Sequence, residues 1–371
     1  MKVALVHDWL YVDGGAEKVL SAFLEIYPDA DIFSLVDFLP DDKRERLLNE
    51  KRATTSFIQK LPFSKKYFKH YLPLFPIAIE QFDLTKYDLV ISSSYAVAKG
   101  VLTPPSSVHI SYCHSPVRYA WDMYHTYIKE HDIKGIKALF IKYVLHKIRI
   151  WDIISSNRVD YFIANSNFVK KRIDKFYKRE AEVIHPFVDT DKFCLEIKKE
   201  DFYLTASRLV PYKKTKLIVE AFNKSGKKLV VIGEGEEYKE IKNIAKSNIK
   251  VLGYREDDVL IEYMQRAKAF VYAALEDFGI VPLEAMACGT PVICYGKGGV
   301  KESVVDGKTG VFFFEQNSEA LNEAIKKFED MRFDPVFISK HALSFSKERF
   351  KKQIKSFVEE KMKENIDVPL Q

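Results

Sequence analysis

The sequence contains little cysteine. Its four cysteines among 371 residues show no paired framework, and they are Cys113, Cys194, Cys288 and Cys294. Cys288 and Cys294 have no second pair with which to build a zinc site. We therefore expect buried thiols in a reducing cytoplasm rather than a disulfide scaffold.

Long apolar runs are absent as well. Only four apolar residues precede His7 and Asp8, which is too few for a signal peptide and suits a first β-strand. Residues 71–79 are apolar but interrupted by Pro73 and Pro76, whereas a membrane span needs about 18 uninterrupted apolar residues. We expect a protein that is soluble or peripheral to a membrane.

Charge of neither sign dominates, since 58 basic and 52 acidic residues give a formal net charge of +6. The basic residues are nevertheless concentrated in residues 60–72 and 129–149, where they alternate with Phe, Tyr and Leu. This mixture suits an anionic membrane surface. Solvated helices with an aromatic core face would give the same pattern, and a nucleic-acid surface is the weakest interpretation. We expect membrane contact and no nucleic-acid partner.

The length and composition favour two domains of roughly 150 to 200 residues each. A hydrophobic fraction of 47% is enough for two cores. Short, nearly continuous apolar runs alternate with helical patterns, which predicts an α/β fold with parallel sheets covered on both faces. The predicted strands are residues 3–6, 88–92, 108–113, 161–164, 203–206, 229–232, 251–252, 269–272, 291–294 and 311–313. The composition changes near residues 185–193, so we predict domains at 1–188 and 189–346.

Residues 276–291 carry the most informative motif, in which Glu276 and Glu284 flank a predicted helix start. Pro282 suits the first helical position, which would place Glu284 in the first turn and Glu276 on the preceding loop. A helix N-terminus favours a phosphate-sized anion. Carboxylates beside a diphosphate would instead accept hydrogen bonds from neutral sugar hydroxyls. The motif therefore predicts a nucleotide-sugar site, although dipole complementation by Glu284 and a solvated Glu276 would also explain it.

Paired carboxylates also occur in glycosidases, where they flank the bond that is cleaved. Pro282 and the helix start argue against that interpretation, because they direct a phosphate site between Glu276 and Glu284. No dedicated nucleophile stands out in the sequence.

The same motif resembles the signature of retaining glycosyltransferases of family 4: two glutamates with seven residues between them, Phe-Gly after the first and Pro-Leu before the second. Four further stretches are similar to the family in the same order. Residues 3–17 resemble its opening strand and glycine turn, residues 112–122 its histidine segment, and residues 207–214 with 231–235 the first strand ends of its second domain.

The resemblance implies the GT-B fold, with two Rossmann-like domains facing each other across a cleft. The N-terminal domain would bind the acceptor and the C-terminal domain the nucleotide-sugar, with a helix at 347–363 packing back onto the first domain. His114 would contact the donor sugar, Arg208 and Lys213 would stabilise the leaving diphosphate, and Glu276 would hold sugar hydroxyls. The other residues that would line the nucleotide-sugar site are Gly14, Gly15, Gly233, Tyr254, Phe278, Gly279, Ile280, Val281, Leu283 and Glu284.

Two positions depart from the family pattern. Asp277 stands where many relatives have glycine, which adds a negative charge near the sugar. Lys214 stands where glycine or asparagine is common, so that either Lys213 or Lys214 could contact the diphosphate, and the spacing from Arg208 favours Lys213. The sequence also lacks the Asp-x-Asp pattern expected of metal-dependent sugar transferases, so we expect no metal and no other cofactor.

Residues 72–80 and 112–122 most resemble bacterial mannosyltransferases of O-antigen and polysaccharide assembly. The resemblance therefore implies a retaining, front-face transfer of mannose from GDP-mannose to a lipid-linked saccharide at the inner face of the cytoplasmic membrane. A UDP-sugar-dependent transferase on the same scaffold is one alternative. A non-catalytic nucleotide-sugar-binding assembly protein is the other.

Overall fold

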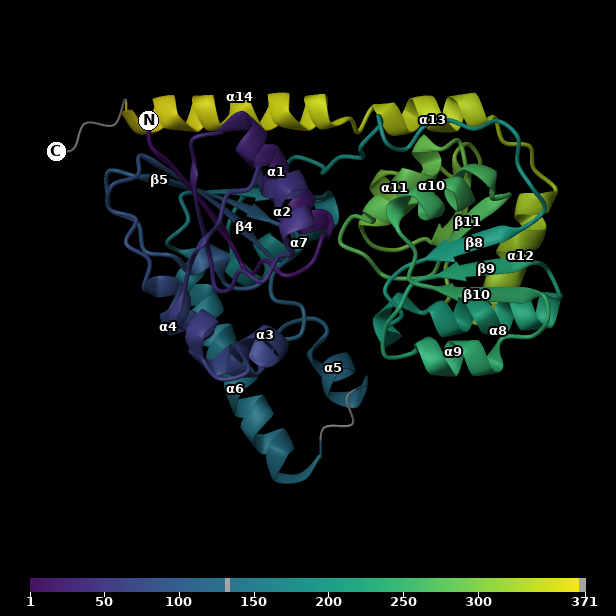
Figure 1. Ribbon diagram of the computed structural model, residues 1–371, viewed down its shortest axis with the longest axis horizontal. Coiled ribbons are helices and arrows are strands. Elements are labelled where there is room, and N and C mark those ends of the chain that lie inside the picture. The colour runs from purple at the N-terminus through teal and green to yellow at the C-terminus, as the bar shows by residue number, and fades with distance from the viewer. Residues whose placement is uncertain (131–133, 367–371) are drawn as a thin grey trace. The chain divides into compact units, whose positions relative to one another are not determined.

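The computed structural model describes residues 1–130 and 134–366 and contains two parallel β-sheets, each flanked by helices (Figure 1). The chain divides into two compact units, which we call unit 1 and unit 2. Unit 1 comprises Met1–Ile184 together with the residues from Lys351 onward, and unit 2 comprises His185–Phe350. The boundary predicted from the sequence was after Val188.

The sheet of unit 1 has seven strands in the order β3-β2-β1-β4-β5-β6-β7. Its strands are β1 (Val3–His7), β2 (Asp31–Ser34), β3 (Thr54–Thr55), β4 (Leu89–Ser94), β5 (Val108–Cys113), β6 (Tyr161–Ala164) and β7 (Ala181–Val183). Its helices are α1 (Gly15–Ile26), α2 (Asp41–Leu48), α3 (Ser64–Tyr67), α4 (Phe75–Glu80), α5 (Tyr124–Glu130), α6 (Gly135–Ser156) and α7 (Asn167–Tyr177). Because β1 pairs with both β2 and β4, the order reverses between β1 and β4, where α/β sheets bind ligands.

The sheet of unit 2 has six strands in the equivalent order β10-β9-β8-β11-β12-β13. Its strands are β8 (Tyr203–Ala206), β9 (Leu229–Ile232), β10 (Ile249–Gly253), β11 (Ala269–Tyr272), β12 (Val292–Tyr295) and β13 (Gly310–Phe313). Its helices are α8 (Thr215–Ser225), α9 (Tyr238–Ile244), α10 (Asp257–Arg266), α11 (Ile280–Ala287), α12 (Ser318–Glu329) and α13 (Pro335–Leu343). The order reverses between β8 and β11.

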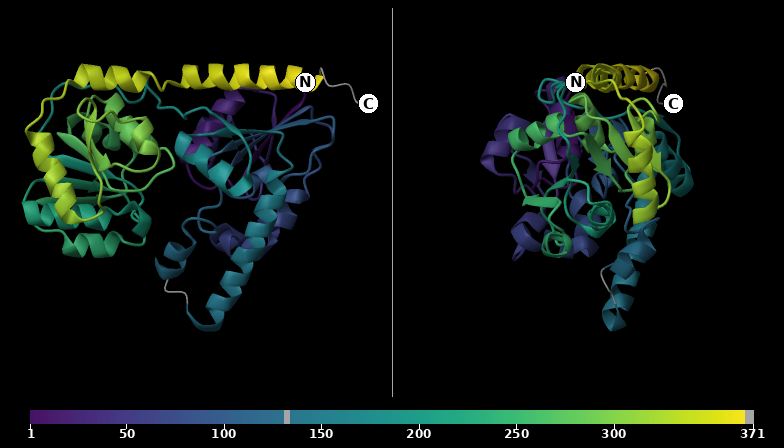
Figure 2. Two further views of the ribbon diagram at one scale, coloured as in Figure 1. Left: turned by 180° about the vertical axis from the view of Figure 1, so that it is seen from behind. Right: turned by 90° about the vertical axis from the view of Figure 1, so that its right-hand side faces the viewer.

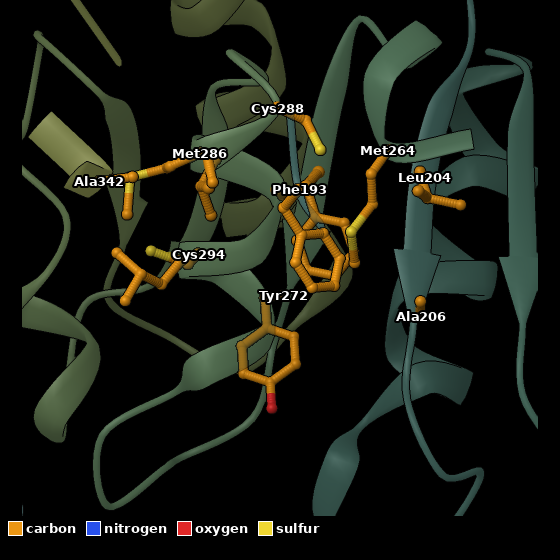
Figure 3. Packing of buried hydrophobic residues seen from close by; sticks show 14 of the residues in the cluster. Phe193, Leu204, Ala206, Met264, Tyr272, Met286, Cys288, Cys294 and Ala342 are labelled. Atoms are coloured by element: carbon orange, nitrogen blue, oxygen red, sulfur yellow. The ribbon is translucent and has the colours of Figure 1, made fainter. Parts of the chain in front are cut away.

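Alternation along the strands builds a hydrophobic cluster on each face of the second sheet. In β11, Phe270 and Tyr272 belong to one cluster, while Ala269 and Val271 belong to the other. The first cluster contains residues of α10, α11 and α13, part of which is drawn in Figure 3, and the second contains residues of α8, α9 and α12. Both faces are therefore covered, which explains why these strands are apolar along their whole length.

The last helix, α14 (Lys347–Ile366), begins in unit 2, and from Lys351 onward it belongs to unit 1. The Lys351 ammonium lies 2.9 Å from the Glu25 carboxylate of α1, and Lys361 lies over the Tyr161 ring. Figure 2 shows this helix from two further directions. No helix within the described ranges combines the length and the apolar character that crossing a bilayer requires.

The predicted α/β class and every predicted strand are confirmed, and the observed strand ends differ from the predicted ones by at most two residues. Strands β2, β3 and β7 were not predicted, because they are short and half polar. The expectation of buried thiols is correct for Cys113, Cys288 and Cys294 and wrong for Cys194, which is exposed. Cys194 lies in an irregular segment before β8, where no core covers it.

The buried histidine of β5 makes unit 1 sensitive to acid. His109 hydrogen bonds Ser92 Oγ and the Arg158 carbonyl, and its burial lowers the pKa to about 4. The unfolded chain therefore binds a proton first, and the free energy of unfolding falls by about 1.4 kcal/mol per pH unit below the unfolded pKa near 6.5.

We expect the His109→Gln variant to lose this contribution, so that its stability falls less steeply between pH 6.5 and about 4. Urea unfolding followed by tryptophan fluorescence measures it, because all three tryptophans, Trp9, Trp121 and Trp151, lie in unit 1. Equal pH slopes for the two proteins would contradict the prediction.

Candidate active site

An ion pair joins the carboxyl ends of β8 and β11, the two neighbouring strands at which the order of the second sheet reverses. Lys213 ends the short 3₁₀ helix after β8, and Glu276 lies on the loop between β11 and α11. The Lys213 Nζ donates to Glu276 Oε1 at 2.6 Å and to the Tyr272 hydroxyl at 3.1 Å. Both charged side chains are only 16% exposed. The fold therefore brings together two of the predicted catalytic residues, and the lysine that contacts Glu276 is Lys213, not Lys214.

The electrostatics of the pair keep the lysine charged. Burial alone would lower the pKa of Lys213, but the Glu276 carboxylate and the Tyr272 and Tyr212 hydroxyls together raise it above its usual value. Burial and the same carboxylate raise the pKa of Tyr272. Lys213 is thus a cation and Tyr272 a neutral hydroxyl at any physiological pH.

Tyr272 was not identified from the sequence. It ends an otherwise apolar strand, so the pattern indicates a core residue, and its ring does belong to the hydrophobic cluster. Figure 3 shows its hydroxyl oxygen pointing away from the packed side chains of that cluster. A polar tip at the carboxyl end of a buried strand, four residues before Glu276, is the signal that could have revealed it.

The loop that carries Glu276 is fixed by a second loop after β12. Glu276 forms a parallel bridge with Gly298, and the Gly299 N–H donates to the Glu276 carbonyl at 2.9 Å. Gly298 has a φ of +84°, and a Cβ there would lie 2.4 Å from the Glu276 carbonyl oxygen. Only glycine allows the two backbones to approach this closely.

Helix α11 starts earlier than the proline predicts. Gly279 is its N-cap and Ile280 its first residue, so Pro282 is in the third position and Glu284 in the second turn, not the first. The predicted placement of both residues is wrong, because the left-handed Gly279 ends the loop three residues before the proline. The predicted helix end is correct, since the helix stops before Gly289. Glu284 is buried.

The apolar residues expected around the helix start face the core. Phe278 and Leu283 are buried in the hydrophobic cluster, against which Ile280 and Val281 also pack. These four residues can therefore offer a ligand mainly their backbone groups. The first N–H groups of a helix are left without intrahelical acceptors, and they favour an anion.

Arg208 lies on the loop between β8 and Lys213, and its Nη2 donates to the Tyr212 hydroxyl at 3.1 Å. The glycine turn after β9 holds this loop, because the Leu209 N–H donates to the Glu234 carbonyl. A Cβ at Gly233 would lie 1.9 Å from the Ser207 carbonyl oxygen. Gly233 therefore has a packing reason to be glycine, namely the close approach of the loop that carries Arg208.

Tyr254 follows β10, at the same edge of the sheet, and is partly exposed with its hydroxyl on Glu256. Together with Gly233, Arg208, Lys213 and Glu276 it occupies the carboxyl ends of the strands of unit 2, the edge at which open α/β sheets bind ligands.

The remaining predicted residues belong to unit 1. Gly14 is the N-cap of α1 and Gly15 its first residue, so the predicted glycine turn lies between β1 and α1. His114 directly follows β5, with its ring packed between those of Tyr95 and Tyr112. Burial lowers the pKa of His114 to about 3, so the ring is neutral near pH 7.

Within the ranges 1–130 and 134–366, no group of three or more His, Cys, Asp or Glu side chains is arranged to hold a metal ion. Among the predicted site residues of unit 2, the charged ones are Arg208, Lys213, Glu276 and Glu284.

We expect the Gly298→Ala variant to displace the Glu276 loop. The left-handed backbone alone costs about 1 to 2 kcal/mol for alanine, and the Cβ would in addition collide with the Glu276 carbonyl. Hydrogen exchange of the Gly299 amide measures the effect directly and should become faster.

The matched control is Gly226→Ala, which has a φ of +71° but open space around the added Cβ. It should destabilise unit 2 by the backbone cost alone and leave local exchange near Gly299 unchanged. Equal effects of the two substitutions at Gly299 would contradict the prediction.

Two protein-family models match the chain. Residues 14–192 match the model described as Glycosyltransferase Family 4, and residues 188–363 match that described as Glycosyl transferases group 1. Among curated proteins, an uncharacterized glycosyltransferase of Methanocaldococcus jannaschii is 30% identical over 198 residues, covering 52% of this chain and 56% of that protein.

Two further relatives are mannosyltransferases by name. The alpha-1,3/1,6-mannosyltransferase alg-2 of Neurospora crassa is 26% identical, covering 56% of this chain and 54% of that protein. The GDP-mannose-dependent alpha-(1-6)-phosphatidylinositol monomannoside mannosyltransferase of Mycolicibacterium smegmatis is 26% identical, covering 48% of this chain and 54% of that protein. The chain thus spans about half the length of these curated relatives, between 54% and 56%.

Solved structures confirm the expected fold. Anabaena HepE in complex with UDP-glucose aligns with a TM-score of 0.69 at 18% identity, covering 97% of this chain and 100% of that one. Sucrose-phosphate synthase from Thermosynechococcus elongatus aligns with a TM-score of 0.71 at 16% identity, covering 97% and 99%. The two family matches together extend from residue 14 to residue 363, and the chain, with its two Rossmann-like units of the GT-B fold, belongs to the glycosyltransferases of family 4.

Proposed function

We propose that the protein is a retaining hexosyltransferase that moves mannose from GDP-mannose to a lipid-linked saccharide in the synthesis of a cell-surface polysaccharide or O-antigen. The observation that supports this most is the Lys213–Glu276 pair at the strand-order reversal of unit 2, with Arg208 on the same loop as the lysine. A cation and a carboxylate side by side match the two halves of a nucleotide-sugar, its diphosphate and its sugar hydroxyls.

The diphosphate of the donor binds between the N-terminus of α11 and the loop that carries both Arg208 and Lys213. The unpaired N–H groups and the dipole of the helix attract the phosphate oxygens. The two cations stabilise the charge that grows on the departing diphosphate. Because Glu276 keeps the Lys213 pKa high, no proton has to be gained before the donor binds.

The carboxylates bind the sugar and not the phosphate. Glu276 accepts hydrogen bonds from hydroxyls of the hexose, and Glu284, which is buried in α11, accepts from the ribose. His114 contacts the donor sugar, as the family resemblance implies, and does so as a neutral ring.

The transfer itself needs no enzyme nucleophile. The bond between the anomeric carbon and the diphosphate oxygen breaks while the acceptor oxygen bonds to the same face of that carbon. The proton of the acceptor hydroxyl passes to the departing diphosphate, so that atoms and charge balance and the anomeric configuration is retained. The reaction is metal-independent, because Arg208 and Lys213 supply the positive charge that a metal ion would otherwise provide.

Mannose is the preferred sugar because the names of two relatives specify mannosyl transfer, one of them from GDP-mannose onto a phosphatidylinositol mannoside. The alternative is a UDP-sugar, since the aligned Anabaena protein was solved with UDP-glucose. That alignment has 18% identity and bears on the fold alone.

Calorimetric titration with GDP-mannose, UDP-glucose and UDP-N-acetylglucosamine, with and without EDTA, tests the donor, and release of the nucleoside diphosphate measures turnover. We expect selective binding of GDP-mannose that EDTA does not weaken. We expect the Arg208→Ala variant to lower kcat by about 10² to 10³, the effect of losing one contact to a developing charge.

Arg266→Ala is the matched control, because Arg266 pairs with Glu200 and Glu262 at the amino end of β11, the opposite edge of the sheet. It should retain full turnover. If another donor is selected, the mannosyl assignment fails. If a donor is bound but none is turned over, the protein is instead a non-catalytic nucleotide-sugar-binding assembly protein.

The lipid part of the proposal is supported by helix α6. Its exposed large side chains lie at helical spacing along one stripe, and they are Ile136, Leu139, Phe140, Tyr143, Ile150, Ile153 and Ile154. Phe140 is 62% exposed, so these residues do not form the aromatic core face that the sequence left open. In Figures 1 and 2 the N-terminal half of α6 extends away from the sheet of unit 1.

The charges of α6 match an anionic bilayer surface. Lys137, Lys142 and Lys147 are exposed on the same helix, which has no acidic residue before Asp152. The first basic stretch contributes Phe63, which is 81% exposed, although its Phe68 is buried in the core. Residues 131–133 of the second stretch lie outside the described part of the chain. We propose that α6 and Phe63 bind an anionic membrane on which the acceptor is found.

We expect the double variant Leu139→Gln, Phe140→Gln to lose binding to vesicles of phosphatidylglycerol and phosphatidylcholine in a flotation assay, because the apolar part of the contact is removed. Turnover on a soluble acceptor analogue should be unchanged. Vesicles of phosphatidylcholine alone are the control and should bind neither protein. Undiminished flotation of the variant would contradict the proposal.

A further inference from the structure

A chain of buried polar side chains leads from the glycine turn to His114. His7 ends β1 and pairs in register with Ser93 of the neighbouring strand β4. The Ser93 hydroxyl lies 3.1 Å from His7 Nδ1 and 2.8 Å from His114 Nε2. On the other side, His7 Nε2 faces Glu17 Oε1 at 3.7 Å. His7, Ser93 and Glu17 are all buried, in the strand-order reversal of unit 1.

Glu17 is held in place by the turn itself. Its Oε2 accepts from the Gly14 N–H at 3.1 Å, which leaves Oε1 directed at His7. The adjacent Asp8 cannot replace it as a partner of His7, because the Asp8 carboxylate accepts from the backbone N–H groups of residues 95–98. Within the described residues, His7 Nε2 has no hydrogen-bond partner. The nearby Glu17 carboxylate therefore decides which end of this ring carries the proton.

Ser93 has only one hydroxyl proton, so the position of the proton on His7 determines the position of the proton on His114. A carboxylate only accepts hydrogen bonds, so a His7 ring that carries one proton holds it on Nε2, facing Glu17, because a lone pair there would be repelled. Nδ1 of His7 is then an acceptor, and the Ser93 hydroxyl donates to it. Ser93 in turn accepts from His114, whose proton must lie on Nε2.

We propose that Glu17, His7 and Ser93 are positioning residues that fix His114 in the tautomer with its proton on Nε2 and its lone pair on Nδ1. His114 then meets the donor sugar as a hydrogen-bond acceptor from a hydroxyl, a role that rests on the proposed function. Glu17 also connects two segments that the sequence showed as separate motifs. Its carboxylate accepts from the Gly14 N–H and faces His7, whose hydrogen bonds lead to His114.

The Glu17→Gln variant should reverse the direction of the hydrogen bonds that join His7, Ser93 and His114. The amide oxygen of glutamine would accept from the Gly14 N–H as Oε2 does now, which turns its NH₂ group toward His7 Nε2. His7 would then carry its proton on Nδ1 and donate to Ser93, and Ser93 would donate to His114 Nε2. The proton of His114 would move to Nδ1, with almost no change in shape.

Long-range ¹H–¹⁵N correlation spectra of the full chain labelled with ¹⁵N-histidine measure the tautomers directly, and the signal lost in His114→Gln assigns His114. We expect the Nε2–H pattern in the native protein and the Nδ1–H pattern in Glu17→Gln. In a Ser93→Ala background, Glu17→Gln should no longer affect His114. A native His114 protonated on Nδ1, or a tautomer that Glu17→Gln leaves unchanged, would overturn the proposal.

Measurements of kcat and of GDP binding distinguish a failure of this inference from a failure of the proposed function. We expect Glu17→Gln to lower kcat about tenfold, the worth of one hydrogen bond, with an unchanged Kd for GDP, because the diphosphate contacts are in unit 2. If no donor is turned over, the proposed function fails while the spectra still decide the tautomer. If the spectra show the reversal but kcat is unchanged, the role of the tautomer in catalysis is refuted.

Discussion

The Lys213–Glu276 ion pair is the interaction on which the candidate site of unit 2 depends. Parallel pairing brings the ends of β8 and β11 together, while the chain leaves these two strands toward opposite sides of the sheet. The gap between the departing loops admits two oppositely charged side chains. Isolated, either charge would be costly to bury. As a pair, with the Tyr272 hydroxyl as a third partner, Lys213 and Glu276 present an ammonium group and an oriented carboxylate before any ligand binds.

Unit 1 uses the equivalent place in its sheet for a different kind of chemistry. The ends of β1, β4 and β5 supply His7, Ser93 and His114, which are joined by hydrogen bonds through the Ser93 hydroxyl rather than by an ion pair. Burial keeps the His114 ring uncharged, and Tyr95 and Tyr112 fix its orientation. One topology thus provides a charged site in one unit and a set of directed hydrogen bonds in the other, and the difference lies in a few side chains at strand ends.

Much of this could be predicted from the sequence, because continuous apolar strands and the Glu276 motif are local patterns. The features that were missed depend on segments far apart in the chain. Gly298 restrains Glu276 from another loop, and Ser93 reaches His114 from another strand, so neither has a local signal. The helix start predicted from Pro282 was wrong for a different reason: Gly279 adopts a left-handed conformation that ends the loop three residues before the proline.

The glycines of the β9 turn have a different evolutionary meaning from the charged residues beside them. Any side chain at Gly233 or Gly235 would collide with the backbone of residues 207–209, whatever the protein does. A descendant that kept only the fold would therefore still preserve both glycines, whereas position 208 is exposed and no such backbone collision restricts its side chain. Preservation of that turn across a lineage would record the survival of the fold, and only preservation of the charged side chains would record the survival of the proposed activity.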